Sequence, residues 1–183
     1  MFLIEGLEKL KLMPKCMSAL LPSLQHLYIS NCPVVELSEG CLPSNVKEMF
    51  LLNCFKLVAS LKGSWGNNRS LKLFYIGNVD VECFPGEGLL PLSLGHLAIY
   101  DCPNLKKLDY RGLCHLSSLQ FVNLCNLPIL QCLPEEGLPK SISKLRIEGC
   151  PLLEQRCKKK GGEDWEKIAH IKSIIVYDKK VNI

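Results

Sequence analysis

The sequence has few aromatic residues and almost no excess of charge of one sign. Aromatic side chains make up 7% of its 183 residues, and 22 basic residues stand against 18 acidic ones, which leaves a net charge of +4. So weak a positive balance is not typical of a nucleic-acid-binding face or of binding to anionic lipid. We therefore predict no nucleic-acid partner.

Long apolar runs are missing as well. Residues 16–35 and 112–134 carry no charge, but proline, serine, histidine, glutamine and asparagine interrupt both stretches. Hydrocarbon does not tolerate polar residues at that density. No basic segment leads into a long apolar run near the N-terminus, as it does in a signal peptide. The sequence predicts neither membrane insertion nor a secretion signal.

Motifs for catalysis, cofactors and metals are also absent. The segment that begins at Lys158, Lys-Lys-Lys-Gly-Gly-Glu-Asp, lacks the Gly-Lys-Ser/Thr ending of a phosphate-binding loop. No nucleophile elbow and no zinc-binding His-Glu-x-x-His occurs. His26 and His96 occupy equivalent positions in separate repeats, too far apart to share a metal. We predict no enzymatic activity, no cofactor and no metal.

Cysteine is plentiful, but its pattern does not indicate disulfides. The number of cysteines, 11, is odd, and no Cys-x-x-Cys spacing occurs. Disulfide frameworks are typical of small secreted domains that lack a sufficient apolar core. Reduced thiols indicate a cytoplasmic or nuclear chain.

Leucine is the residue that the sequence has in excess, with 34 copies. Many of them follow the pattern LxxLxIxxCP, which is strongest at residues 24–33, 94–103 and 142–151. Weaker copies start at 46, 71 and 119, and a partial first copy, near residue 7, has Leu7, Leu10 and Leu12. From residue 24 onward the starts lie 22 to 25 residues apart, which is the period of a leucine-rich repeat.

A second period supports the first. Pro43, Pro91 and Pro139 are spaced by 48 residues, each three residues before a repeat start, and each follows a Glu-Gly connector. The repeats at 71 and 119 are reached through different segments, so we expect two alternating kinds of turn.

The pattern predicts the fold class. Apolar residues at repeat positions 4 and 6 alternate with variable ones, as in a short strand with one buried face. Stacking of such repeats gives an α/β leucine-rich-repeat solenoid, or horseshoe, with a parallel sheet on its concave face and a mostly irregular or 3₁₀ convex side. We predict repeats over residues 1–153 and a C-terminal cap over 154–183, with a short helix at 163–170 and a strand at 174–177.

Two further repeat positions predict structural roles. Position 8 is Asn or Asp in five successive copies, and these residues tolerate unusual backbone angles where the chain leaves a strand. Position 9 is often Cys, which packs between coils as a small apolar residue.

Positions 3, 5 and 7 should line the concave face. Tyr28, Phe50 and Tyr75 at position 5 would stack on adjacent strands, with Leu52 and Leu73 beside them. Rigid aromatic residues in one patch are typical anchors of protein interfaces, although strand propensity and cross-strand packing also favour them. We therefore hypothesise a protein ligand on this face, whose candidate residues are Tyr28, Phe50, Tyr75, Tyr100, Phe121, His26, His96, Leu52, Leu73 and Arg146.

The repeats, the Glu-Gly-Leu-Pro connectors and above all the ending, from Cys150-Pro-Leu-Leu to Glu-Asp-Trp-Glu-Lys-Ile-Ala-His-Ile171, resemble a known family. The chain is similar to the C-terminal leucine-rich region of plant nucleotide-binding leucine-rich-repeat disease-resistance proteins of the coiled-coil class. The resemblance implies an intracellular immune receptor segment that recognises pathogen effectors or the host proteins they modify, and that restrains a neighbouring nucleotide-binding domain.

Two other classes compete with this interpretation. An extracellular leucine-rich receptor or inhibitor predicts constant 24-residue spacing, paired cap cysteines and a signal peptide. A substrate adaptor of a ubiquitin ligase predicts an F-box upstream of the repeats. We see no cap at the N-terminus and expect this chain to be the C-terminal piece of a longer array, or a truncated copy of one.

Overall fold

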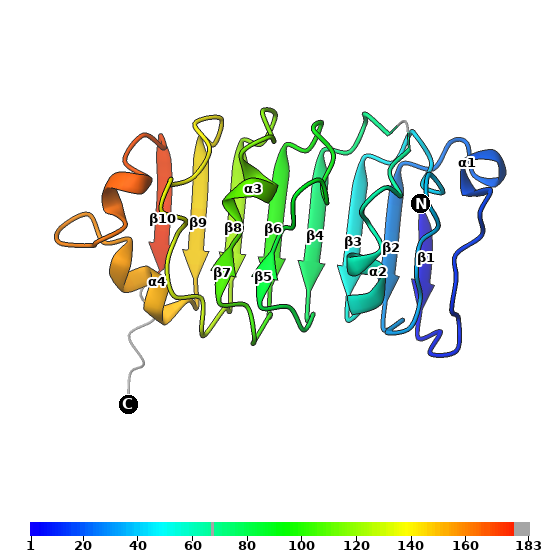
Figure 1. Ribbon diagram of the computed structural model, residues 1–183, viewed down its shortest axis with the longest axis horizontal. Helices are drawn as coiled ribbons and strands as arrows, with labels where there is room; N and C mark the ends of the chain where they lie inside the picture. Colours follow the sequence, from blue (N-terminus) through cyan, green and yellow to red (C-terminus); the bar gives the residue numbers. More distant parts are fainter. Residues whose placement is uncertain (67, 178–183) are drawn as a thin grey trace.

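The computed structural model describes residues 1–66 and 68–177. Its main feature is a sheet of parallel strands in the order β1-β2-β3-β4-β6-β8-β9-β10 (Figure 1). These strands are β1 (Phe2–Glu5), β2 (His26–Ser30), β3 (Glu48–Leu52), β4 (Leu73–Gly77), β6 (His96–Tyr100), β8 (Phe121–Cys125), β9 (Lys144–Glu148) and β10 (Ser173–Tyr177). The strands form one side of a continuous coil, so the predicted leucine-rich-repeat solenoid is confirmed.

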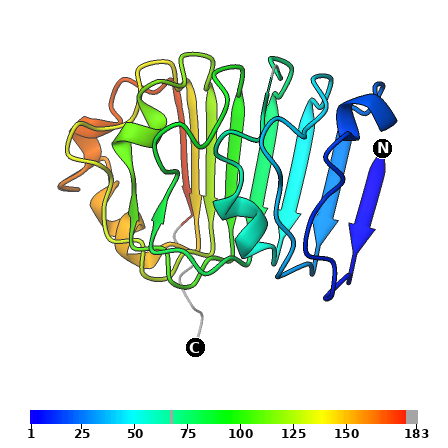
Figure 2. The ribbon, with the colours of Figure 1, turned by 45° about the vertical axis from the view of Figure 1, so that its right-hand side comes forward.

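The return segments lie on the opposite side of the core and hold only short elements (Figure 2). They include α1 (Met17–Leu20), α2 (Phe55–Ala59), α3 (Tyr110–Leu113), α4 (Pro151–Arg156) and the 3₁₀ helix η1 (Trp165–Lys167). A second parallel ladder joins β5 (Cys83–Phe84) to β7 (Lys107–Leu108). The sequence did not predict this ladder, because a two-residue strand carries no measurable alternation. None of the helices in the described part of the chain is long and apolar enough to span a membrane.

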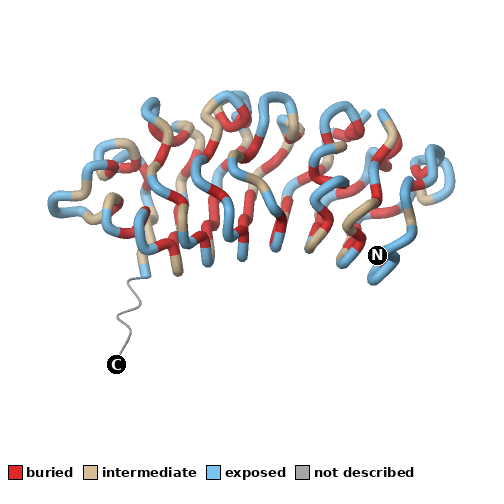
Figure 3. Tube along the Cα trace, turned by 60° about the horizontal axis from the view of Figure 1, so that its bottom comes forward, coloured by how far each residue is buried: buried red, intermediate tan, exposed pale blue. Residues whose placement is uncertain are grey.

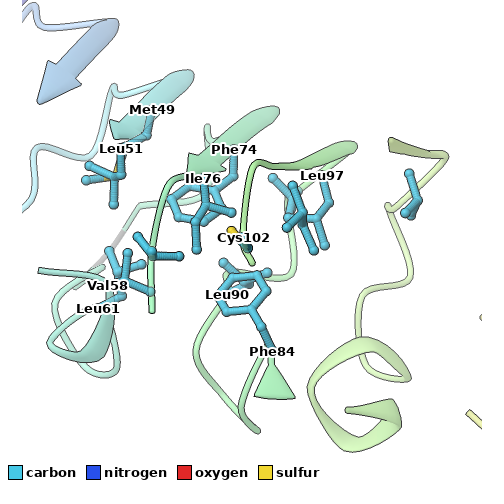
Figure 4. Packing of buried hydrophobic residues seen from close by; sticks show 14 of the residues in the cluster. Met49, Leu51, Val58, Leu61, Phe74, Ile76, Phe84, Leu90, Leu97 and Cys102 are labelled. Atoms are coloured by element: carbon cyan, nitrogen blue, oxygen red, sulfur yellow. The ribbon is translucent and has the colours of Figure 1, made fainter. Parts of the chain in front are cut away.

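The core runs through the whole coil, and buried residues recur from one turn to the next (Figure 3). Leu27, Leu97 and Leu145, at position 4 of the three strongest repeats, are almost completely buried. Figure 4 shows the same packing from close by, where strand residues such as Phe74 and Ile76 face Phe84 and Leu90 from the return segments. Each strand therefore depends on its neighbours and on its own return segment for burial.

Position 9 supplies small apolar side chains to this core, as predicted. Cys32, Cys54, Cys102 and Cys150 are fully buried, and all 11 cysteines are free thiols. Burial raises the pKa of Cys54 to about 11 and that of Cys150 to about 12. These thiols are therefore protonated near neutral pH and serve as packing groups.

The first coil differs from the prediction. Its strand is β1, which lies before Leu7 and pairs with β2, with Ile4 opposite Ile29. Leu7 and Leu12 are about half exposed and belong to the return segment. The prediction that the first repeat starts near residue 7 was wrong, because leucines in a return segment can have the same spacing as those at a repeat start.

The C-terminal end also differs in detail. The strand predicted at 174–177 is present as β10, parallel to β9. The prediction of a helix at 163–170 was wrong, because this segment contains only the single 3₁₀ turn η1. The helix of this region is α4, which begins earlier, at Pro151. Ile168 and Ile171 nevertheless cover the last coil, since both are buried. Residues 178–183 of the predicted cap lie outside the described residues.

Candidate functional site

The candidate site is the face of the sheet that points away from the core, which we call the open face. It carries repeat positions 3, 5 and 7, and neighbouring strands pair without any shift in register. Tyr28 is therefore opposite Phe50, and Phe50 is opposite Tyr75. Columns of equivalent side chains cross the sheet at right angles to the strands.

Four of these side chains form one aromatic stack, Tyr28–Phe50–Tyr75–Tyr100. Successive ring centroids are 4.5, 5.5 and 4.6 Å apart, and the planes are within 27° of parallel. Such offset-stacked rings attract each other beyond the effect of buried area. Because the ring faces contact one another, the stack presents mainly ring edges and tyrosine hydroxyls to its surroundings.

Tyr100 joins the stack although it stands at position 7, which sequence reasoning missed. In the register, Tyr75 is opposite Ala98 and Tyr100 is opposite Gly77. These two small residues leave the space in which the rings of Tyr75 and Tyr100 meet diagonally. A Cβ atom at Gly77 would approach Leu52 to 2.7 Å and Tyr75 to 3.2 Å. The small residues at positions 77 and 98 are the sequence feature that could have predicted the place of Tyr100 in the stack.

The other candidate residues form smaller groups around the stack. The rings of His96 and Phe121 stack at 4.2 Å, and the Nζ atom of Lys144 lies 4.6 Å from the centre of the Phe121 ring. Arg146 donates to Glu148 at 2.6 Å and lies over Tyr177. His26 contacts Glu48 at 2.8 Å, Leu52 is 39% exposed, and Leu73 is half-buried.

Two polar groups within the open face lack partners. The Oδ1 atom of Asn123 and the Nε2 atom of His96 are buried and make no hydrogen bond within the described residues. The Nδ2 atom of Asn123 donates to the hydroxyl of Tyr100. Burial, together with Lys144, lowers the pKa of His96, so its ring is neutral near pH 7. An unpaired buried polar atom is unfavourable, and a ligand that pairs with it gains affinity.

The hydroxyl groups of Tyr75 and Tyr100 in the stack are affected by burial. Burial, followed by nearby negative charge, raises the pKa of Tyr75 and of Tyr100, so both stay protonated and can donate hydrogen bonds. His26 and His96 lie apart, as predicted, since His26 is on β2 and His96 is on β6, three strands away. Within residues 1–66 and 68–177, no three potential metal-ligating side chains form a group.

Comparison with known proteins identifies the relatives of this chain. A protein of Arabidopsis thaliana described as a disease resistance protein, At3g14460, is 35% identical over 158 residues, which cover 84% of the chain. The chain is homologous to a region of plant disease-resistance proteins. The disease resistance protein RGA4 of Solanum bulbocastanum is a second such homologue, 46% identical over 59 residues, or 31% of the chain. No family model matches the sequence.

The two matches cover a small part of each disease-resistance protein. The matched regions make up 11% of the Arabidopsis protein and 6% of the Solanum protein. The chain therefore corresponds to about a tenth of a much longer relative.

Proposed function

We propose that this chain is the protein-recognition part of an intracellular plant immune receptor and takes no part in catalysis. In this role it senses pathogen effectors, or host proteins changed by them, and restrains the nucleotide-binding domain of a full-length receptor. The homology to disease-resistance proteins supports the defence role. We propose a cytoplasmic location for it, in keeping with its free thiols.

The observation that carries the proposal is the aromatic stack on the open face. Tyr28, Phe50, Tyr75 and Tyr100 form a row across four neighbouring strands, and all are partly exposed. Aromatic anchors on a rigid sheet bury a large area with little loss of conformational entropy. Strand propensity alone favours single aromatic residues, but it does not require four of them in contact on the side turned away from the core.

The test is a split-receptor experiment. The Arabidopsis relative, with its matched 158-residue segment removed, is co-expressed in leaves with this chain, and their association is measured by co-precipitation. We expect the chain to associate with the remainder of the receptor. The triple variant Tyr28→Ala, Phe50→Ala, Tyr75→Ala should lose most of this association, because hot-spot residues contribute on the order of 2 kcal/mol each.

Two controls make the result specific. The native Arabidopsis segment shows that the split receptor can assemble. The variant Phe55→Ala, Leu92→Ala, Leu152→Ala removes three exposed apolar residues outside the open face and should associate normally. Equal association of the two triple variants, or assembly with the native segment but not with this chain, would contradict the proposal.

A further inference from the structure

Lysines gather along one edge of the open face. Repeat positions 2 and 3 lie at the N-terminal edge of the sheet, where the strands begin, at the top of Figure 1. Lys47, Lys72 and Lys172 occupy position 2, and Lys144 occupies position 3; all four are exposed. Lys47 and Lys72 are on adjacent coils, since the Lys72 N–H donates to the carbonyl of Lys47 at 2.7 Å.

None of these four lysines has a carboxylate partner among the described residues. Some lysines elsewhere do have such a partner, as Lys56 has in Glu36 and Lys106 in Glu82. Glu48, at position 3, carries a carboxylate at this edge, and that carboxylate contacts His26 and none of the four lysines. Lys47 and Lys72 are adjacent like charges that form no ion pair, which is unfavourable in the free protein, and both are available to an anionic partner.

The opposite edge has the opposite charge. At positions 7 and 8, where the strands end, the charged residues of the described chain are Glu5, Asp101 and Glu148. Between the two edges lies the aromatic stack, and β3 and β4, which Lys47 and Lys72 precede, also carry Phe50 and Tyr75. The open face is thus polarised across its width, from basic to aromatic to acidic.

We infer that the open face binds an acidic segment of a partner protein, placed so that its carboxylates meet Lys47 and Lys72 and its apolar side chains cover the aromatic stack. This inference rests on the proposed recognition function and specifies the chemistry and orientation of the partner. Complementary charge along one rim steers association and sets the direction of binding, while the buried aromatic residues supply most of the affinity.

A protein segment fits this surface better than a nucleic acid does. Nucleobases bind by stacking on free aromatic faces, but the ring faces of Phe50 and Tyr75 already contact their neighbours. Ring edges carry partial positive charge and suit carboxylate and carbonyl oxygens.

The experiment selects ligands from random peptides displayed on phage, with the purified chain as target. Enriched peptides should combine Asp or Glu with apolar residues. The dissociation constant of a synthetic copy of the most enriched peptide is then measured for the wild type and for the variant Lys47→Glu, Lys72→Glu, in which it should rise about tenfold at low salt. In about 1 M salt, where the Debye length is about 3 Å, the difference should shrink.

The matched control reverses two adjacent exposed lysines in the cap, Lys159→Glu and Lys160→Glu, which changes the net charge equally and should leave affinity unchanged. Circular dichroism verifies the fold of each variant. Enriched peptides without acidic residues, or equal weakening by both double variants, would overturn the inference. A single-stranded oligonucleotide that binds more tightly than the peptide would overturn it too.

The variant Tyr28→Ala, Phe50→Ala, Tyr75→Ala separates the two proposals. If it abolishes peptide binding while the Lys47→Glu, Lys72→Glu variant binds normally, the result supports recognition by the open face and contradicts the inference of an acidic partner. If neither variant affects binding, or if no peptide is enriched, both proposals fail.

Discussion

At the scale of single residues, one column of the repeat makes the coil possible. Asn31, Asn53, Asn78, Asp101 and Asn126 at position 8 all have positive φ angles between 51° and 55°, and Gly6 and Gly149 have the same sign at the two ends of the column. Each of these residues turns the chain out of its strand. Most L-residues avoid this left-handed region, whereas Asn and Asp enter it at smaller energetic cost.

Asn53→Ala tests this account. Alanine lacks the local hydrogen bonding that favours asparagine at φ 52°, and it removes the bond from Asn53 Nδ2 to Asn31 Oδ1. We expect a loss of about 1 to 2 kcal/mol in the free energy of unfolding, measured by urea denaturation. Asn53→Gly should recover most of this loss, because glycine accepts positive φ. If the alanine and glycine variants are equally stable, the backbone explanation is wrong.

At the scale of elements, the C-terminal coil is held by the buried carboxylate of Asp164. This side chain accepts hydrogen bonds from Arg156 at 3.1 Å and from the N–H of Leu133 at 2.9 Å, and it contacts Lys167 at 3.0 Å. Burial favours a higher pKa for Asp164, but the hydrogen bonds from Arg156, Leu133 and Lys167 outweigh it and hold the pKa below 3.8. One carboxylate therefore joins the cap to the return segment of the preceding coil.

Asp164→Asn should lower the free energy of unfolding by about 3 kcal/mol, because it removes the counter-charge of Lys167 and leaves Arg156 with Glu163 as its one carboxylate partner among the described residues. Since the folded-state pKa is depressed, the stabilisation is complete above the unfolded-state pKa and is lost as the pH falls through the folded-state value. The wild type should therefore lose part of its advantage over Asp164→Asn below about pH 4. Urea denaturation of both proteins at several pH values measures this, and a difference that does not change with pH would contradict it.

Elements with a strict period could be predicted from the sequence, and elements that depend on distant contacts could not. Position 4 and position 6 residues, such as Leu97 and Ile99, alternate with variable ones and correctly indicated parallel strands. The segment 163–170 has good helical spacing, yet the bonds to Asp164 hold it in a single 3₁₀ turn. For the open face, the stacking of Tyr28, Phe50 and Tyr75 followed from register, whereas the place of Tyr100 depended on the space left by small neighbours.

At the scale of the whole molecule, stability comes from contacts between successive coils. Each inner strand pairs on both sides, but β1 and β10 stand at the ends of the sheet and pair only with β2 and β9 within the described residues. In β1 only Ile4 is buried, and Leu3 is 60% exposed. Since each coil contacts only its nearest neighbours, opening can start at an end without disturbing the middle.

Amide hydrogen exchange should therefore show a gradient along the coil. We expect β1 to exchange fastest, β4, β6 and β8 to exchange slowest, and β10 to lie between them because the residues around Asp164 hold its coil in place. In the Asp164→Asn protein, protection of β9 and β10 should fall while that of β4 stays the same, which mass spectrometry of peptic fragments resolves. Uniform protection of all strands in the wild type, or a loss that extends equally to β4 in the variant, would mean that the molecule opens as one cooperative unit and not coil by coil.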